Sequence, residues 1–158
     1  MKKITPERLK NSALYYLERY EASAWKLRDV LKRRLAKARL DQPVPSEAPA
    51  WIEEIIAEMC RLGYVNDKRF AENTVRRLTN AGKSPSFIQA KLRQAGVSEE
   101  EIQWALSETD ELTSARLMVQ KKHLGQDYNR DLARLARAGF SYDIAKEALE
   151  EVIKEPEL

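Results

Sequence analysis

The sequence contains an internal repeat with an offset of 43 residues. The stretch that begins at Asp67 returns from Asp110, with glycines and serines at matching positions. The matching pairs are Gly82 with Gly125, Gly96 with Gly139, and Ser98 with Ser141. Repeats of this length stack so that each contacts mainly its neighbours, which builds an extended surface suited to long or large partners. The repeat therefore favours a binding protein over an enzyme for small substrates.

The first helix of each repeat is expected to begin at an aspartate and to end at a glycine. The carboxylates of Asp67 and Asp110 can accept hydrogen bonds from the free amides of a first turn. Gly82 and Gly125 end these helices, because glycine adopts the left-handed conformation that follows a last turn.

Serine caps are expected to begin three of the other helices in these two repeats. The second helix spans residues 84–96 and starts with serine followed by proline, and its counterpart runs from about residue 129 to 139. Ser98 starts the third helix, with Glu101 placed to close a capping box, and Ser141 repeats the cap without the glutamate.

The first 66 residues fit a looser copy of the same repeat. Helices are expected over residues 5–20, 23–38 and 49–62, each supported by a cap, a proline or apolar spacing. The offset to the second repeat is 61 residues rather than 43, because a loop with three prolines at 40–49 is inserted between helices. No segment requires a strand.

The predicted fold class is all-α, with three tandem three-helix repeats forming an elongated, curved array. The predicted repeats cover residues 1–66, with the Pro-rich insertion at 40–49, then residues 67–109 and residues 110–158.

Composition excludes several classes of protein. Apolar residues make up 43% of the chain and charged residues 34%, which is unlike a disordered tail or a membrane protein. No run of about 18 apolar residues occurs, and no apolar segment follows Lys2 and Lys3, so neither a membrane span nor a secretory signal is expected. A single cysteine, Cys60, agrees with a reducing compartment, and a cytoplasmic location is expected.

Catalytic, metal and cofactor sites are not predicted. The five glycines are nearly all explained as helix stops, which leaves none for a phosphate-binding loop. Cys60 is interpreted as a packed small residue and His123 as a residue at a helix end or on the surface, too few to bind zinc. An acidic cluster is interpreted as residues favoured by helix dipoles; it comprises Glu99, Glu100, Glu101, Glu108, Asp110 and Glu111.

Basic residues recur on the second helix of each repeat and are the candidate binding residues. The net charge of +3 is too small to indicate nucleic acid by itself, but the recurrence indicates one basic side. A solvated helix face is the alternative for any single residue. The candidates for contact with a partner or with DNA are Arg28, Lys32, Arg33, Lys91, Arg93, Arg134 and Arg137.

Aromatic residues leave two interpretations open. Trp25 and Trp104 lie near apolar helical positions, which favours packing between repeats over stacking on bases. The role of Tyr15, Tyr16 and Tyr20 stays open.

The segment from Gly63 to Ala71, with the sequence GYVNDKRFA, resembles the hallmark of the RecX family of bacterial regulators of the RecA recombinase. Residues 82–106 are similar to the family's second repeat, including the Gly82-Lys83-Ser84-Pro85 turn. Residues 134–144 are similar to its third repeat. Two features depart from the family pattern: Ser84 replaces a common glycine, and Ala95 and Ala138 stand where a basic residue often precedes the glycine.

The resemblance implies a regulator without catalytic activity. Members of the family modulate and usually inhibit RecA by lodging in the groove of its filament on single-stranded DNA, which opposes recombination, DNA repair and the co-protease activity of the SOS response. The expected partner is thus the RecA filament on single-stranded DNA, with weak direct DNA binding, no membrane, no cofactor and a monomeric chain. Two alternatives remain, a stand-alone helical protein that reads duplex or single-stranded DNA and a plain helical scaffold.

Overall fold

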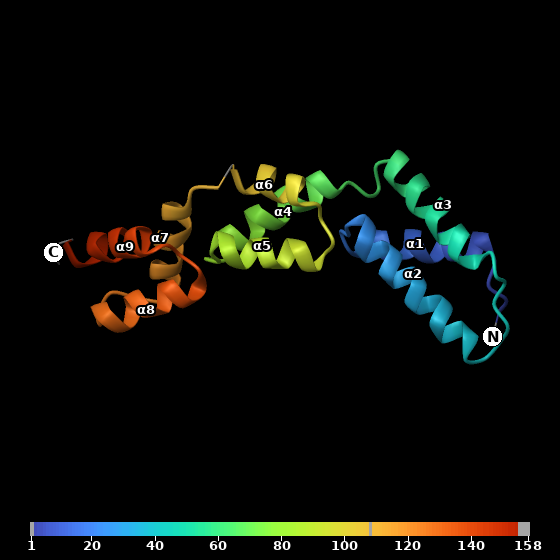
Figure 1. The fold of residues 1–158 in the computed structure, drawn as a ribbon, viewed down its shortest axis with the longest axis horizontal. Helices are drawn as coiled ribbons and strands as arrows, with labels where there is room; N and C mark the ends of the chain where they lie inside the picture. Colours follow the sequence, from blue (N-terminus) through green and yellow to red (C-terminus); the bar gives the residue numbers. More distant parts are fainter. Residues whose placement is uncertain (1, 108, 155–158) are drawn as a thin grey trace. The chain divides into compact units, whose positions relative to one another are not determined.

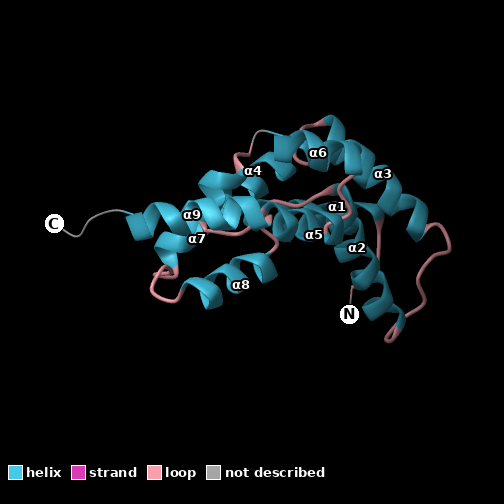
Figure 2. Cartoon of the chain, turned by 60° about the vertical axis from the view of Figure 1, so that its left-hand side comes forward, coloured by secondary structure: helices cyan, strands magenta, loops and turns pink. Residues whose placement is uncertain are grey.

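The computed structural model describes residues 2–107 and 109–154, and this part of the chain is helical without strands (Figures 1 and 2). The predicted all-α fold class is confirmed. None of the described helices is both long and apolar enough to cross a bilayer. The helices are α1 Pro6–Arg19, α2 Ala24–Arg39, α3 Ala48–Arg61, α4 Asp67–Asn80, α5 Pro85–Gln94, α6 Glu99–Ser107, α7 Glu111–Lys121, α8 Tyr128–Ala138 and α9 Tyr142–Lys154.

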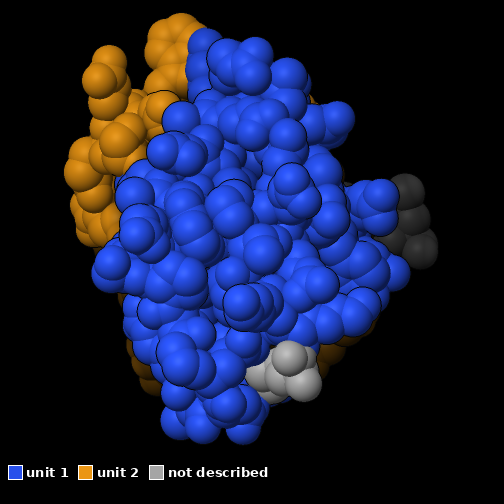
Figure 3. Space-filling view, turned by 90° about the vertical axis from the view of Figure 1, so that its right-hand side faces the viewer, with its two compact units in different colours: residues 1–70, 95–97 blue, residues 71–94, 98–158 orange. Residues whose placement is uncertain are grey.

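Contacts divide the chain into two compact units, which Figure 3 distinguishes by colour. Unit 1 contains residues 1–70 and 95–97, and unit 2 contains residues 71–94 and 98–158. The limits of the three repeats, at 66/67 and 109/110, stay a prediction.

Unit 1 is built around α3, which contacts both α1 and α2. Leu27 and Leu31 lie one turn apart on α2 and are fully buried against Ile52 and Met59 of α3 and Leu9 of α1. The isoleucines and the methionine of α3 are buried, because they follow the spacing of one helical stripe.

Unit 2 contains two groups of packed helices. Helix α9 contacts α7 and α8, and Ala115, Leu135, Ala145 and Leu149 are fully buried there. Helix α5 contacts α6, and Ile88, Leu92 and Ile102 are buried on these two helices.

A buried serine joins α2 to a distant turn inside unit 1. The hydroxyl of Ser23 accepts a hydrogen bond from the Lys26 amide at 3.1 Å, so it caps α2. The same hydroxyl donates to the carbonyl of Ala95 at 2.5 Å. One side chain thus satisfies a free amide at the start of one helix and a carbonyl 72 residues later. We call this pair of hydrogen bonds a serine joint.

The same joint is present in unit 2, at the residues that match in the repeat. Ser84 accepts from the Phe87 amide at 3.2 Å, which caps α5, and donates to the carbonyl of Ala138. Ser23 and Ser84 are both fully buried. Asp127 occupies the corresponding position before α8, where its carboxylate accepts from the Arg130 amide at 3.3 Å.

Glycine follows each acceptor carbonyl because the joint leaves no room for a side chain. Gly96 has a φ of +74°, and a Cβ atom there would collide with Cβ and Cγ of Trp25. Gly139 has a φ of +107°, and its Cβ atom would approach Cβ of Ser86 to 2.5 Å. Trp25 and Ser86 each lie two residues after the joint serine, so the two glycines are required for the same reason.

The expected capping role of Asp67 is wrong. Asn66 caps α4, since its side-chain oxygen accepts from the Arg69 amide at 3.0 Å. Asp67 is the first helical residue, and its carboxylate instead accepts from the Ala24 amide of α2 at 2.8 Å. In the second repeat Pro85 takes the place of Ala24 and has no amide hydrogen. Asp110, which matches Asp67 at the start of the third repeat, does cap its own helix by accepting from Leu112 at 3.0 Å.

The other helix starts follow the sequence closely. Thr5 and Ser98 accept from amides in their own first turns, as expected. Ser141 also caps its helix, with Ile144 as donor at 3.4 Å. The glutamate that Ser141 lacks in its own first turn is supplied by α7, because the Ser141 amide donates to Glu111 at 3.0 Å.

Candidate partner-binding surface

Arg28 of α2 is held by a carboxylate of its own unit. Its Nε and Nη2 atoms donate to the two oxygens of Glu53 on α3 at 2.7 and 3.0 Å. This bidentate bond raises the pKa of Arg28 and lowers the pKa of Glu53. Arg28 therefore braces α2 against α3, and a partner would have to compete with Glu53 for it.

Lys32 and Arg33 lie on the same helix and differ in their contacts. The Nε atom of Arg33 is 3.0 Å from Asp29, one turn earlier on α2. Lys32 is exposed and makes no hydrogen bond or ion pair within residues 2–107 and 109–154, although its charge helps to lower the pKa of Glu53. Of the three candidates on α2, Lys32 is the one whose charge is most available.

Lys91 and Arg93 of α5 show the same contrast. Arg93 donates to both oxygens of Glu99 at 2.5 and 3.1 Å, and this bond lowers the pKa of Glu99. Lys91 is exposed, and its Nζ atom lies 5.6 Å from the centre of the Phe87 ring, within range of a weak cation–π contact.

Arg134 and Arg137 lie on α8 of unit 2. Arg134 is half-buried and Arg137 is exposed. Neither guanidinium has a hydrogen-bonded or ion-paired side chain among the described residues. The seven predicted candidates therefore form two classes, Arg28, Arg33 and Arg93 with internal carboxylate partners, and Lys32, Lys91, Arg134 and Arg137 without them.

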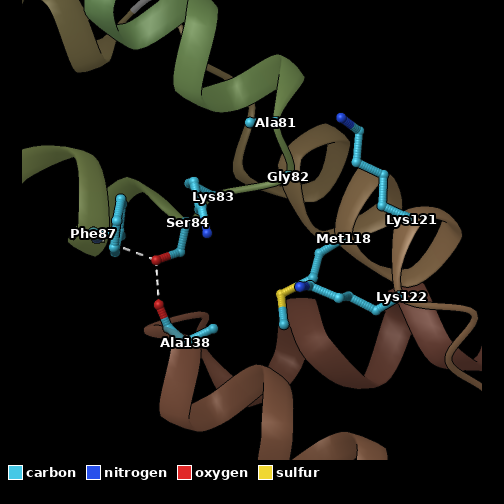
Figure 4. Close-up of a pocket in the computed structure, with 9 residues that line it drawn as sticks. All are labelled: Ala81, Gly82, Lys83, Ser84, Phe87, Met118, Lys121, Lys122 and Ala138. Atoms are coloured by element: carbon cyan, nitrogen blue, oxygen red, sulfur yellow. Dashed lines mark hydrogen bonds between the residues drawn. The ribbon is translucent and has the colours of Figure 1, made fainter.

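Unit 2 also contains a basic hollow that was not predicted from the sequence, and Figure 4 shows it in close-up. It encloses about 110 Å³ beside the Ser84 joint and is lined by Lys83, Lys121 and Lys122 together with Phe87 and Met118. Figure 4 shows Lys122 extending along Met118 while Lys121 extends in another direction. Lys83 lies 5.0 Å from the centre of the Phe87 ring. The hollow thus combines three ammonium groups with an exposed aromatic edge.

A sequence signal for this hollow exists at the helix ends. Lys83 directly follows the stop of α4, and Lys121 and Lys122 stand at the end of α7. Cations are favoured at helix C-termini by the helix dipole, so each lysine alone has a local explanation. Only the tertiary contact between the two helix ends brings the three together.

The acidic cluster of the sequence is dispersed among structural contacts. Glu99 binds Arg93, Asp110 caps α7, and Glu111 accepts from the Ser141 amide. Glu108 lies outside the described residues. Within the described part of the chain, no three His, Cys, Asp or Glu side chains are grouped as metal ligands.

Two interpretations of single residues require correction. Cys60 is exposed rather than packed inside, although partial burial of its thiol and the nearby Asp67 raise its pKa. Trp104 is 53% exposed, so packing between repeats does not cover its ring. Trp25 lies against Gly96 but is still 45% exposed, and His123 follows the end of α7 with a φ of +53°.

Comparison with known proteins matches both the sequence and the fold. A family model described as RecX, second three-helix domain, matches residues 66–106. A Regulatory protein RecX of Myxococcus xanthus is 37% identical over 94% of this chain and 88% of its own length. Another, of Agrobacterium fabrum, is 29% identical over 94% and 85%.

A solved structure extends the match to three dimensions. The crystal structure of RecX from Lactobacillus salivarius superposes with a TM-score of 0.73 at 25% identity, covering 94% of this chain and 96% of that one. This chain therefore shares its fold, with nine helices in residues 2–107 and 109–154, with a solved RecX protein. The identity to the Myxococcus xanthus protein, sustained over nearly the whole chain, shows that this chain belongs to the RecX family.

Proposed function

We propose that this chain is a non-enzymatic regulator of RecA, which acts in the cytoplasm as a monomer and inhibits the RecA filament on single-stranded DNA. The observation that carries the proposal is the similarity to regulatory proteins along 94% of the chain. Inhibition of the filament would lower strand exchange in recombination and repair and the co-protease activity of the SOS response.

The distribution of cations supports a filament as the partner. Each unit has basic side chains without internal carboxylate partners among the described residues, Lys32 in unit 1 and Lys91, Arg134 and Arg137 in unit 2. A nucleoprotein filament repeats its negative charges along its length, so several separate cations can bind at once. A small-molecule ligand offers no comparable series of charges.

The basic hollow of unit 2 fits the same partner. Lys83 and Lys122 can approach one phosphate or carboxylate group, Lys121 adds a third positive charge nearby, and the Phe87 edge supplies an apolar contact next to it. We include these lysines in the proposed binding surface.

Co-sedimentation tests the proposal with three mixtures. The chain is centrifuged with RecA, single-stranded DNA and nucleotide, with RecA alone, and with DNA alone. We expect it to pellet in the first mixture and to lower the rate of RecA-dependent strand exchange. Equal pelleting with DNA alone would favour a stand-alone DNA-binding protein, and no pelleting in any mixture would contradict both functions.

A further inference from the structure

We propose that a groove in unit 1 binds single-stranded nucleic acid directly, through phosphate contacts and stacking on tyrosine. The groove encloses about 630 Å³ between the N-terminal segment, α1 and α2. Its charged and aromatic lining consists of Lys2, Lys3, Arg8, Arg34, Tyr15 and Tyr16.

The charged side chains among the described residues that line the groove are all positive. Four cationic side chains face the groove, and no carboxylate is among the described residues that line it. Arg8 also organises the groove, because its Nη1 atom donates to the carbonyl of Lys3 at 2.7 Å and holds the N-terminal segment beside α1. From the other side, the Gln42 amide donates to the carbonyl of Lys2 at 3.0 Å. The lysines are thus presented on a tethered segment beside α1.

Tyr15 provides a stacking surface that the core does not use. It is 61% exposed, whereas most large apolar side chains of α1 pack inward. The guanidinium carbon of Arg19 lies 3.7 Å from the centre of its ring, which restrains the ring by a cation–π contact. A restrained, exposed ring loses little conformational entropy when a base stacks on it.

Tyr16 also lines the groove. It packs partly against the core of unit 1, and its ring centre lies 5.0 Å from that of Tyr20, with the planes tilted by 40°. Burial, and secondly the nearby Tyr20, raise the pKa of Tyr16, so its hydroxyl stays protonated and can donate to a phosphate oxygen.

The cations and the exposed tyrosine that line this groove fit one class of partner, single-stranded nucleic acid. An acidic peptide would pair with the cations but would gain little from an exposed tyrosine. A charged groove with an aromatic platform is the usual design for single strands. Bases in a duplex are already stacked on each other, so the platform favours an unpaired strand. The volume lies within the range of about 300–1,000 Å³ typical of small-ligand sites, enough for a few nucleotide groups and not for a duplex.

This inference does not depend on the proposed RecA function, because it concerns DNA without RecA. Fluorescence anisotropy with a labelled oligothymidylate of about 16 nucleotides tests it directly. The chain is compared as wild type and with Tyr15→Ala, Tyr15→Phe and Arg34→Ala. Tyr142→Ala is the matched control for the tyrosine, since Tyr142 is 60% exposed in unit 2. Lys37→Ala is the control for Arg34, because it is an exposed cation of α2 outside the groove.

We expect Tyr15→Ala to weaken binding by about 5- to 150-fold, the loss of one stacked base, and Tyr15→Phe to bind like the wild type. Arg34→Ala should weaken binding and lower its dependence on salt, and both controls should leave it unchanged. An abasic oligonucleotide of equal length should bind more weakly and lose its sensitivity to Tyr15→Ala. Circular dichroism verifies that each variant is folded.

Two results would overturn the inference. One is equal loss of affinity in Tyr15→Ala and Tyr142→Ala, and the other is equal affinity of the wild type for abasic and base-containing strands. Co-sedimentation with RecA is read separately, so failure of this groove and failure of the filament proposal give different patterns.

Discussion

The hydroxyl of Ser84 donates to the main-chain carbonyl of Ala138, and Ser23 makes the equivalent bond to Ala95. Each serine also caps its own helix, so one buried oxygen connects the start of a helix to a turn that lies 54 or 72 residues further along the chain. The internal repeat of the sequence therefore includes a repeated tertiary contact.

Ser84→Ala is expected to lower the free energy of unfolding by about 1–3 kcal/mol, because it removes a cap and leaves the carbonyl of the partly buried Ala138 without its side-chain donor. Ser98→Ala is the matched control, since Ser98 caps α6 from an exposed position in the same unit and has no second partner in the described bonds. Urea denaturation measures both. Equal losses in the two variants would show that the joint adds nothing to the cap.

Gly96→Ala is expected to destabilise the chain more than Gly63→Ala. Both glycines have a positive φ, +74° and +81°, so alanine incurs a similar backbone cost of about 1–2 kcal/mol at either site. A Cβ atom at Gly63 meets nothing within 4 Å, whereas at Gly96 it meets Cβ of Trp25, which cannot rotate away from its own backbone. Thermal unfolding of the two variants should differ, and identical midpoints would contradict the close packing of Trp25 on Gly96.

Asp67 and Ala24 are expected to be energetically coupled. Asp67→Ala should cost about 1.5–3 kcal/mol in the wild type, the value of a hydrogen bond to a charged group. In an Ala24→Pro background the donor is absent, and proline is tolerated at a first helical position. Asp67→Ala should then cost clearly less. A double-mutant cycle by denaturation gives the coupling, and a value near zero would show that the 2.8 Å hydrogen bond is not stabilising.

Acid is expected to weaken the brace between Arg28 and Glu53. The folded-state pKa of Glu53 lies below its ordinary value of 4.5, so its stabilisation is present above that value and disappears as pH falls through the lower folded-state pKa. Glu53→Gln should therefore flatten the decline of stability between about pH 5 and 3. Glu54→Gln, at the exposed neighbour on α3, should leave the decline unchanged. A wild-type slope in Glu53→Gln would exclude the pair as a source of acid sensitivity.

The four cations without internal partners are expected to dominate binding to the RecA filament. Simultaneous replacement of Lys32, Lys91, Arg134 and Arg137 by glutamine should weaken binding. The slope of log affinity against log salt concentration should fall by about 0.7 to 0.9 for each phosphate that the variant no longer neutralises. Joint replacement of Arg28, Arg33 and Arg93 is the control and should have a smaller effect, because these side chains are engaged by Glu53, Asp29 and Glu99. Binding at several salt concentrations measures both, and the reverse order would assign the surface to the paired arginines.

Local chemistry predicted most helix limits and few tertiary contacts. Thr5 and Ser98 could be assigned as caps because a cap is decided within one turn of helix. Asp67 was assigned wrongly because its carboxylate is used by Ala24 from another helix, which sequence spacing does not reveal.

For the candidate binding residues, too, the sequence did not reveal the side-chain contacts. The recurrence of basic residues on equivalent helices was visible in the sequence, but the partner of each residue was not. Arg93 and Glu99 lie 6 residues apart on either side of the turn between α5 and α6, and the spacing alone did not show that this turn brings their charged groups together. Lys83 and Lys122 were missed because each stands at the end of a different helix and their shared hollow depends on the packing of unit 2.

Asp127 occupies, before α8, the position that Ser23 and Ser84 hold before α2 and α5. A hydroxyl can donate to a carbonyl, but an ionised carboxylate can only accept, so Asp127 cannot repeat the bond made by Ser23 and Ser84. At the opposite end, α2 closes at Leu40 in the right-handed conformation, without the glycine that the joint requires. Within the described residues the contact is therefore made twice, by Ser23 and by Ser84, because the start of α8 lacks a donor hydroxyl and the end of α2 lacks a glycine.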